Sequence, residues 1–183
     1  MTGSNEMPAA GASGDDGSVD QAKGRVLVVD DEAAVAGQLS DGLKMFGYDV
    51  VEASSVREAR VLLEADPSIT VVVTDIRMPD ADGLGFARHI MAERDDATAV
   101  EVILITGHAT IDDASSAMRA RVVDFLRKPF RLREAAEAVM YADARAGARR
   151  RREDLRRQLE QKLRELCEAS VEPLLPSLRV DDQ

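Results

Sequence analysis

The chain has 183 residues, 45% of them hydrophobic, which suits one domain with additional segments rather than two full domains. Its formal net charge of −10 argues against a nucleic-acid coat or an anionic membrane surface as the main partner. A single cysteine, Cys167, excludes an internal disulfide framework, and no apolar run approaches the about 18 residues of a membrane span, so we expect a cytoplasmic protein.

Residues 1–23 contain almost no large apolar side chain, which predicts a disordered tail. Strand-like apolar runs follow at 25–29, 49–53, 71–74, 101–105 and 122–126. Helix-like segments, with apolar residues three and four apart, lie at 33–46, 55–65, 84–93, 111–119 and from 132 onward. This alternation predicts an α/β fold in which helices cover both faces of a five-stranded, doubly wound parallel sheet. The runs VLVV, VVVT and VILI are apolar throughout, as expected of strands buried on both faces.

From residue 132 to about residue 169 the chain has no proline and one glycine, Gly147, which predicts a helix longer than the domain needs. We therefore divide the chain into a domain at 24–145 and a helical extension with a tail at 146–183. The extension carries an apolar stripe that is typical of a short coiled coil, formed by Leu155, Leu159, Leu163 and Leu166. Its charge also differs, because residues 141–170 sum to +3 whereas residues 24–130 sum to −8.

Polar residues follow the predicted strands where each strand ends. Asp30 and Asp31 follow the first strand, Asp75 the third and Thr106 the fourth, and Lys128 lies just beyond the fifth. Sites in open parallel sheets form at this carboxyl edge, so these five side chains are predicted to converge. Acids crowded together are costly unless a cation joins them, and oxygen ligands with room for water suit Mg²⁺.

Four motifs occur in this order along the chain: VLVVDDE at 26–32, TDIRMPDADG at 74–83, ILITGHA at 103–109 and DFLRKPF at 124–130. Together they resemble the receiver domain of bacterial response regulators over about residues 24–145. The resemblance implies a flavodoxin-like sheet with strand order 2-1-3-4-5. It also implies a regulatory phosphoacceptor rather than an enzyme, with a histidine kinase or phosphotransfer protein as the phosphoryl donor.

The resemblance assigns the phosphoryl acceptor and the metal ligands. Asp75 would take the phosphoryl group, and Mg²⁺ would be held by Asp30, Asp31, Asp75 and the backbone carbonyl of Arg77. Such a transfer depends mainly on positioning and charge neutralisation, which a nucleophilic carboxylate beside a metal ion and a lysine supplies.

The resemblance also assigns a switch. Lys128 would pair with the phosphoryl oxygens, Thr106 would move to bond them, and Phe125 would turn inward as its aromatic partner. The bond between Lys128 and Pro129 would be cis. The aspartyl phosphate carries about −1.5 to −2 charge, so a two-state element nearby can report it on a distant face.

Some residues depart from the family pattern or lack a firm role. Arg121 stands where the family usually has glycine, which indicates either a differently built turn or a partner contact. Arg77 and His108 occupy positions that modulate dephosphorylation in this family, whereas His89 is expected to be a surface or core residue.

Three hypotheses describe the output. In the first, the protein signals to a downstream target through protein contacts or homodimerisation, using its C-terminal helix or a receiver face. In the second, the chain is the regulatory receiver of a longer transcription factor or signalling enzyme. In the third, the seven arginines of 145–157 bind nucleic acid. We do not favour the third, because no aromatic residue accompanies these arginines and the rest of the chain is acidic. A solvated helix face is the favoured interpretation of the arginines, and contact with an acidic partner is an alternative.

Overall fold

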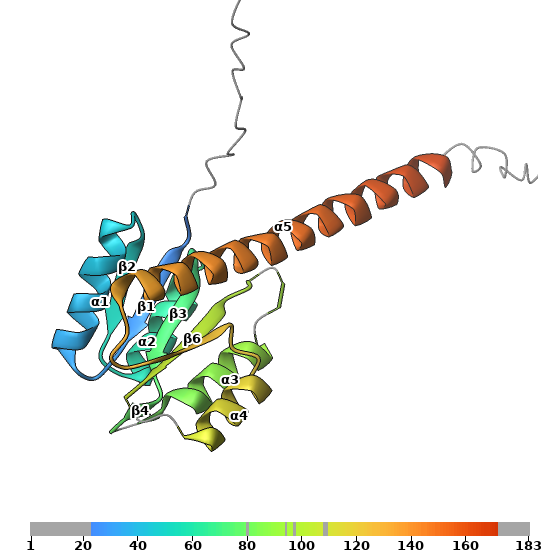
Figure 1. Cartoon of the computed structure of the whole chain (residues 1–183). Coiled ribbons are helices and arrows are strands. Elements are labelled where there is room, and N and C mark those ends of the chain that lie inside the picture. Colours follow the sequence, from blue (N-terminus) through green and yellow to red (C-terminus); the bar gives the residue numbers. More distant parts are fainter. Residues whose placement is uncertain (1–22, 80, 94, 97, 108–109, 172–183) are drawn as a thin grey trace, which may run out of the picture.

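The computed structural model describes residues 23–79, 81–93, 95–96, 98–107 and 110–171. Its main sheet has five parallel strands, named β1 (Arg25–Val29), β2 (Asp49–Ala53), β3 (Ile69–Asp75), β6 (Glu101–Thr106) and β7 (Asp124–Arg127). They lie in the order β2-β1-β3-β6-β7 (Figure 1). Counted within the sheet, this is 2-1-3-4-5, so the predicted flavodoxin-like fold is confirmed.

Helices cover both faces of the sheet, as predicted (Figure 1). On one face lie α2 (Val56–Ala65), α3 (Gly83–Glu93) and α4 (Ile111–Arg119), which bury Phe86 among others against Leu27 and Leu104 of the strands. On the other face lie α1 (Ala33–Met45) and α5 (Leu132–Val171), which pack against Val26 and Ile103. Neighbouring residues of one strand thus belong to hydrophobic cores on opposite faces of the sheet, because side chains alternate along a strand.

Two glycines are required by the backbone around these elements. Gly47, in the turn from α1 to β2, has φ of 81°, a conformation that L-residues rarely adopt. A Cβ on Gly83, the first residue of α3, would lie 1.9 Å from the carbonyl oxygen of Asp75. The lack of a side chain at Gly83 therefore lets α3 begin directly beside the end of β3.

The observed bounds differ from the prediction mainly at the ends of elements. β3 begins at Ile69, two residues early, and β7 begins at Asp124, two residues late. β7 starts late because the turn after α4 uses Arg121 and the next two residues, although Val122 and Val123 are apolar enough to resemble a strand. The antiparallel pair β4 (Arg77–Met78) and β5 (Ala81–Asp82) was not predicted, since strands of two residues leave no periodic pattern.

Helix α5 is a single helix of 40 residues that runs across the sheet and extends well past it (Figure 1). It passes through the predicted boundary between residues 145 and 146 without interruption, so that boundary stays a prediction. The predicted N-terminal tail, apart from Lys23, and residues 172–183 lie outside the described residues. Among the helices that the structure describes, none is long and apolar enough to cross a membrane.

The turn after α4 keeps a left-handed residue even though the chain has arginine there. Arg121 has φ of 58° and is exposed, so the possibility of a differently built turn is excluded. The left-handed conformation costs an L-residue about 1–2 kcal/mol in the folded state. Glycine avoids this cost, but its greater conformational freedom stabilises the unfolded chain by about 0.4–1 kcal/mol.

We therefore expect Arg121→Gly to raise the free energy of unfolding by at most about 1 kcal/mol, measured by chemical denaturation. Arg60→Gly is the matched control, because Arg60 is an exposed residue inside helix α2, where glycine should lower the free energy of unfolding by about 1 kcal/mol. A loss of stability in Arg121→Gly would mean that the arginine side chain compensates for its own backbone strain.

Candidate functional site

The carboxyl ends of four parallel strands bring the predicted residues to one edge of the sheet. Asp30 directly follows β1, Asp75 ends β3, Thr106 ends β6 and Lys128 directly follows β7. Because β1, β3, β6 and β7 are adjacent and parallel, residues almost 100 positions apart in sequence meet there. The structure thus brings Asp30, Asp75 and Lys128 into direct contact at this edge.

The ammonium group of Lys128 lies between two carboxylates. Its Nζ donates to Asp30 Oδ2 at 2.9 Å and to Asp75 Oδ2 at 2.6 Å. The side chains of Asp30, Asp75 and Lys128 are 6%, 11% and 22% exposed, so the contact is largely removed from water. Burial alone would lower the pKa of Lys128, but the hydrogen bonds to Asp75 and Asp30 outweigh it and raise the pKa. Lys128 is therefore a fixed positive charge at neutral pH.

The second oxygen of each carboxylate is held by its own loop. Asp30 Oδ1 accepts the backbone N–H of Glu32 at 2.9 Å, and Asp75 Oδ1 accepts the backbone N–H of Arg77 at 2.8 Å. Each acid thus has one oxygen fixed by the backbone two residues later and the other directed at a shared cation. This arrangement orients both carboxylates before any ligand arrives.

Thr106 and the loop after β7 are joined through the backbone. Thr106 is fully buried, and its carbonyl oxygen accepts the backbone N–H of Lys128 at 2.8 Å. The peptide bond between Lys128 and Pro129 is cis, as the resemblance implied. Phe125 is half-buried and packs against the core on the α2, α3 and α4 face.

The predicted metal ligands are brought together only in part. Asp30 and Asp75 converge on one cation position, whereas the side chain of Asp31 is exposed. In the described part of the chain, no three His, Cys, Asp or Glu side chains form a group ready to hold a metal ion. The paired carboxylate oxygens still suit Mg²⁺ chemically, since it prefers oxygen ligands, but the ligand set stays a prediction.

The remaining candidates are Arg77, His89 and His108. Arg77 is exposed and contributes its backbone N–H to Asp75. His89 is a partly exposed residue of α3 that lies 3.0 Å from Glu93, as a surface histidine would. His108 lies outside the described residues.

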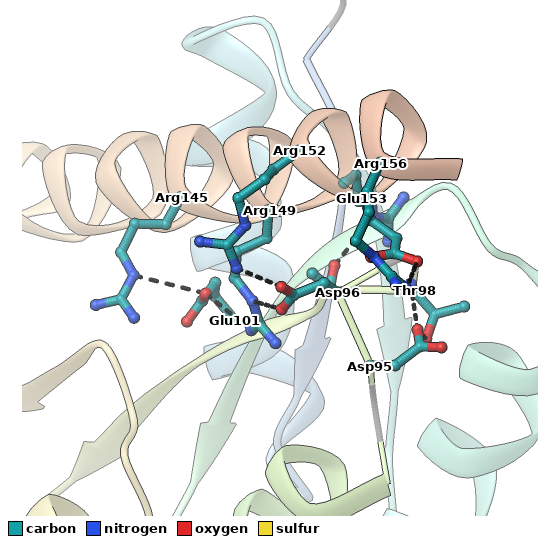
Figure 2. A network of polar contacts seen from close by, with 11 residues as sticks. Asp95, Asp96, Thr98, Glu101, Arg145, Arg149, Arg152, Glu153 and Arg156 are labelled. Atoms are coloured by element: carbon teal, nitrogen blue, oxygen red, sulfur yellow. Dashed lines mark hydrogen bonds and ion pairs between the residues drawn. The ribbon is translucent and has the colours of Figure 1, made fainter. Parts of the chain in front are cut away.

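Sequence reasoning missed a second polar cluster, at the opposite edge of the sheet. Several arginines of the Arg-rich segment bind the domain itself, including Arg149, which contacts Asp96 and Glu101 (Figure 2). One signal was present in the sequence, because Glu101 is a lone acid at the start of the otherwise apolar strand EVILIT. An acid in such a place needs a buried positive partner.

Comparisons with known proteins place this geometry in a family. A family model described as the response regulator receiver domain matches residues 26–140. The transcriptional regulatory protein FixJ of Bradyrhizobium diazoefficiens is 34% identical over 110 residues, which are 59% of this chain and 51% of that protein. The C4-dicarboxylate transport transcriptional regulatory protein DctD of Rhizobium meliloti is 35% identical over 126 residues, which are 69% of this chain and 26% of that protein. The chain spans about half or less of the length of these curated relatives.

Solved structures of response regulator receiver domains are also similar to this chain. The response regulator receiver protein from Pseudomonas putida is 37% identical with a TM-score of 0.61, and the match covers 66% of this chain and 98% of that one. A response regulator receiver domain from Clostridium thermocellum is 32% identical with a TM-score of 0.62, covering 68% and 98%. With the carboxylates and the lysine at the sheet edge, these matches show that the chain belongs to the response regulator receiver domain family.

Proposed function

We propose that the protein is a phosphorylation-dependent response regulator of a two-component system or phosphorelay, acting in the cytoplasm. Asp75 accepts the phosphoryl group from a histidine kinase or phosphotransfer protein. The observation that carries this proposal is the convergence of the Asp30 and Asp75 carboxylates on the ammonium group of Lys128. The protein is a regulatory phosphoacceptor, and its own chemistry is limited to gaining and losing this group.

In the transfer step, a carboxylate oxygen of Asp75 attacks phosphorus in line with the bond to the donor. The bond to the donor breaks, and its electron pair leaves with the donor. The backbone N–H of Arg77 and the ammonium group of Lys128 hold the two oxygens of Asp75, so the nucleophile is oriented beforehand. Asp30, Asp31, Asp75 and the backbone carbonyl of Arg77 would hold Mg²⁺, which would supply positive charge to offset that of the phosphoryl oxygens.

The aspartyl phosphate carries about −1.5 to −2 charge beside a buried hydroxyl, in place of the single negative charge of the carboxylate. Thr106, which has no exposed surface, supplies that hydroxyl to a phosphoryl oxygen, and its movement makes room for Phe125 to turn inward. The backbone N–H of Lys128 donates a hydrogen bond to the carbonyl oxygen of Thr106. This bond supports a coupled movement of the loops that follow β6 and β7. The changed face then binds a downstream protein target.

The proposal is tested by incubating the purified protein with a small phosphodonor such as acetyl phosphate. In the presence of Mg²⁺ we expect the intact mass to increase by one phosphoryl group, and we expect alkaline treatment to remove that group. Chelation of divalent cations should prevent the increase. An unchanged mass under all donor and metal conditions would contradict the proposed function.

The C-terminal helix is proposed as a dimerisation element. Leu155, Leu159, Leu163 and Leu166 are each between 57% and 62% exposed, although such side chains gain most when buried. The comparisons do not favour either alternative, the longer regulator or nucleic-acid binding, and Arg149 and Arg150 already bind groups of the domain.

Light scattering should show that dimers dissociate when Leu159 and Leu163 are both replaced by Lys. Met45→Lys is the matched control, because Met45 is also highly exposed, at the end of α1, and should leave the mass unchanged. If the double variant keeps the mass of the parent protein, the stripe is not the dimer interface. A parent protein that is monomeric with and without beryllofluoride and Mg²⁺ would also exclude the stripe as a dimer interface.

A further inference from the structure

A buried acid at the amino-terminal edge of the sheet depends on α5. Glu101, the first residue of β6, has a fully buried side chain. Its Oε1 lies 3.2 Å from Arg149 Nη1 and 3.5 Å from Arg145 Nε, whereas its Oε2 is buried without a hydrogen-bond partner in the described structure. A buried carboxylate persists only with positive partners close by, so α5 must stay in place here.

Arg149 also joins α5 to the connection that leads into β6. Its Nε donates to Asp96 Oδ1 at 2.9 Å, and Arg152 pairs with the same carboxylate. The hydrogen bonds from Arg152 and Arg149 lower the pKa of Asp96. Arg149 is only 25% exposed, whereas Arg152 is 73% exposed, so the pair between Arg149 and Asp96 is the less screened by solvent. Figure 2 shows these arginines reaching from one side of α5 toward Asp96 and Glu101.

Arg150 binds three backbone carbonyl groups of the domain. Its guanidinium group donates to the carbonyl oxygens of Ala99 at 3.0 Å, Pro67 at 2.8 Å and Ile69 at 2.8 Å. These carbonyls belong to the chain segments that enter β3 and β6. The planar guanidinium group, with five donors in a fixed geometry, suits such a set of acceptors. We call Arg145, Arg149 and Arg150 the arginine clamp. Together they fix α5 to the segments that lead into β3 and β6.

A weak point of the helix lies inside this clamp. Gly147 stands between Arg145 and Arg149, and glycine is the poorest helix former apart from proline. Packing does not require it, because a Cβ there would meet only the flexible end of Arg151, at 3.1 Å. The four leucines of the exposed stripe all lie beyond this point.

We propose that α5 contains a hinge at Gly147 that the arginine clamp holds closed. With the clamp closed, residues 148–171, which we call the α5 arm, continue the helix as a rigid arm in a direction set by the domain. With the clamp open, the helix bends at Gly147 and the leucine stripe loses its fixed direction. This inference concerns the mechanics of the output helix and does not rest on the phosphorylation of Asp75.

Spin labels can test the hinge because Cys167 is the sole cysteine and is exposed near the end of the α5 arm. A second label enters at Gln38→Cys, an exposed position of α1. Pulsed electron paramagnetic resonance then gives the distribution of distances between the labels. Labelled protein is diluted with unlabelled protein so that only distances within one chain contribute.

We expect a single narrow distribution in the parent protein. Replacing Arg149 and Arg150 by Met should roughly double its width, because an unclamped glycine samples many backbone conformations. Adding Gly147→Ala should narrow it again, since alanine favours the continuous helix. The matched control replaces Arg156 and Arg157 by Met, because these arginines pair with Glu153 and Glu160 on the same helix, and it should leave the width unchanged.

Asp96→Asn is a milder variant for the case in which the double clamp variant does not fold. It weakens the contact with Arg149 but leaves Glu101 paired, and it should broaden the distribution in the same direction. A clamp variant that folds by circular dichroism and keeps the narrow distribution would overturn the proposal. An equal broadening in the Arg156 and Arg157 control would also overturn it.

Discussion

An Asp75→Asn variant is expected to incorporate no phosphoryl group, either from acetyl phosphate or from a histidine kinase. The amide matches the carboxylate in shape but is not a nucleophile toward phosphorus. The reaction therefore has no acceptor, and phosphorylation should be abolished rather than slowed. The rest of the site should persist, because Asp30 still pairs with Lys128 at 2.9 Å. Intact-mass measurement after incubation with donor and Mg²⁺ gives the readout.

Glu52→Gln is the matched control for Asp75→Asn. Glu52 is an exposed acid on β2, at the edge of the same sheet, and its replacement removes the same charge without touching the cluster. We expect this variant to be phosphorylated to the same extent as the parent protein. If Asp75→Asn still gains a phosphoryl group at full extent, a different residue is the acceptor.

The fold was predictable where the sequence carries a long pattern. β1 and β2 have the predicted bounds because apolar β-branched runs there are ended by polar residues. The same pattern misled at β7, where Val122 and Val123 belong to a turn that Arg121 enters with φ of 58°. Local backbone geometry decided that boundary, and side-chain hydropathy does not encode it.

The cluster at the carboxyl edge of the sheet was predictable, because the order of parallel strands brings their ends together. Asp30, Asp75 and Lys128 needed only a parallel sheet to meet at one edge. Side-chain direction was not predictable, and Asp31, adjacent to Asp30 in sequence, proved to be exposed. The arginine clamp was harder still, because Arg149 and Glu101 are 48 residues apart and meet only through the path of α5 over the sheet.

A Lys128→Met variant is expected to lose about 3 kcal/mol of unfolding free energy in buffer without divalent cations, by analogy with broken buried ion pairs. The two carboxylates that share its ammonium group are 6% and 11% exposed, so its removal leaves two like charges close together and poorly hydrated. Chemical denaturation in the presence of a chelator measures this loss. Lys44→Met is the control, since Lys44 is exposed and 3.7 Å from Asp41, and it should change stability by less than about 0.5 kcal/mol.

Two titrations separate a charge effect from a packing effect in Lys128→Met. Mg²⁺ should stabilise the variant more than the parent protein, because a divalent cation replaces the missing charge between Asp30 and Asp75. The pKa of Lys128 is raised in the folded protein, so its contribution is present at neutral pH and is lost as pH rises through the folded pKa, above 10.5. The parent protein should therefore approach the variant in stability only in that alkaline range. If the difference persists there and Mg²⁺ has no effect, Lys128 stabilises the fold by packing of its methylene chain rather than by its charge.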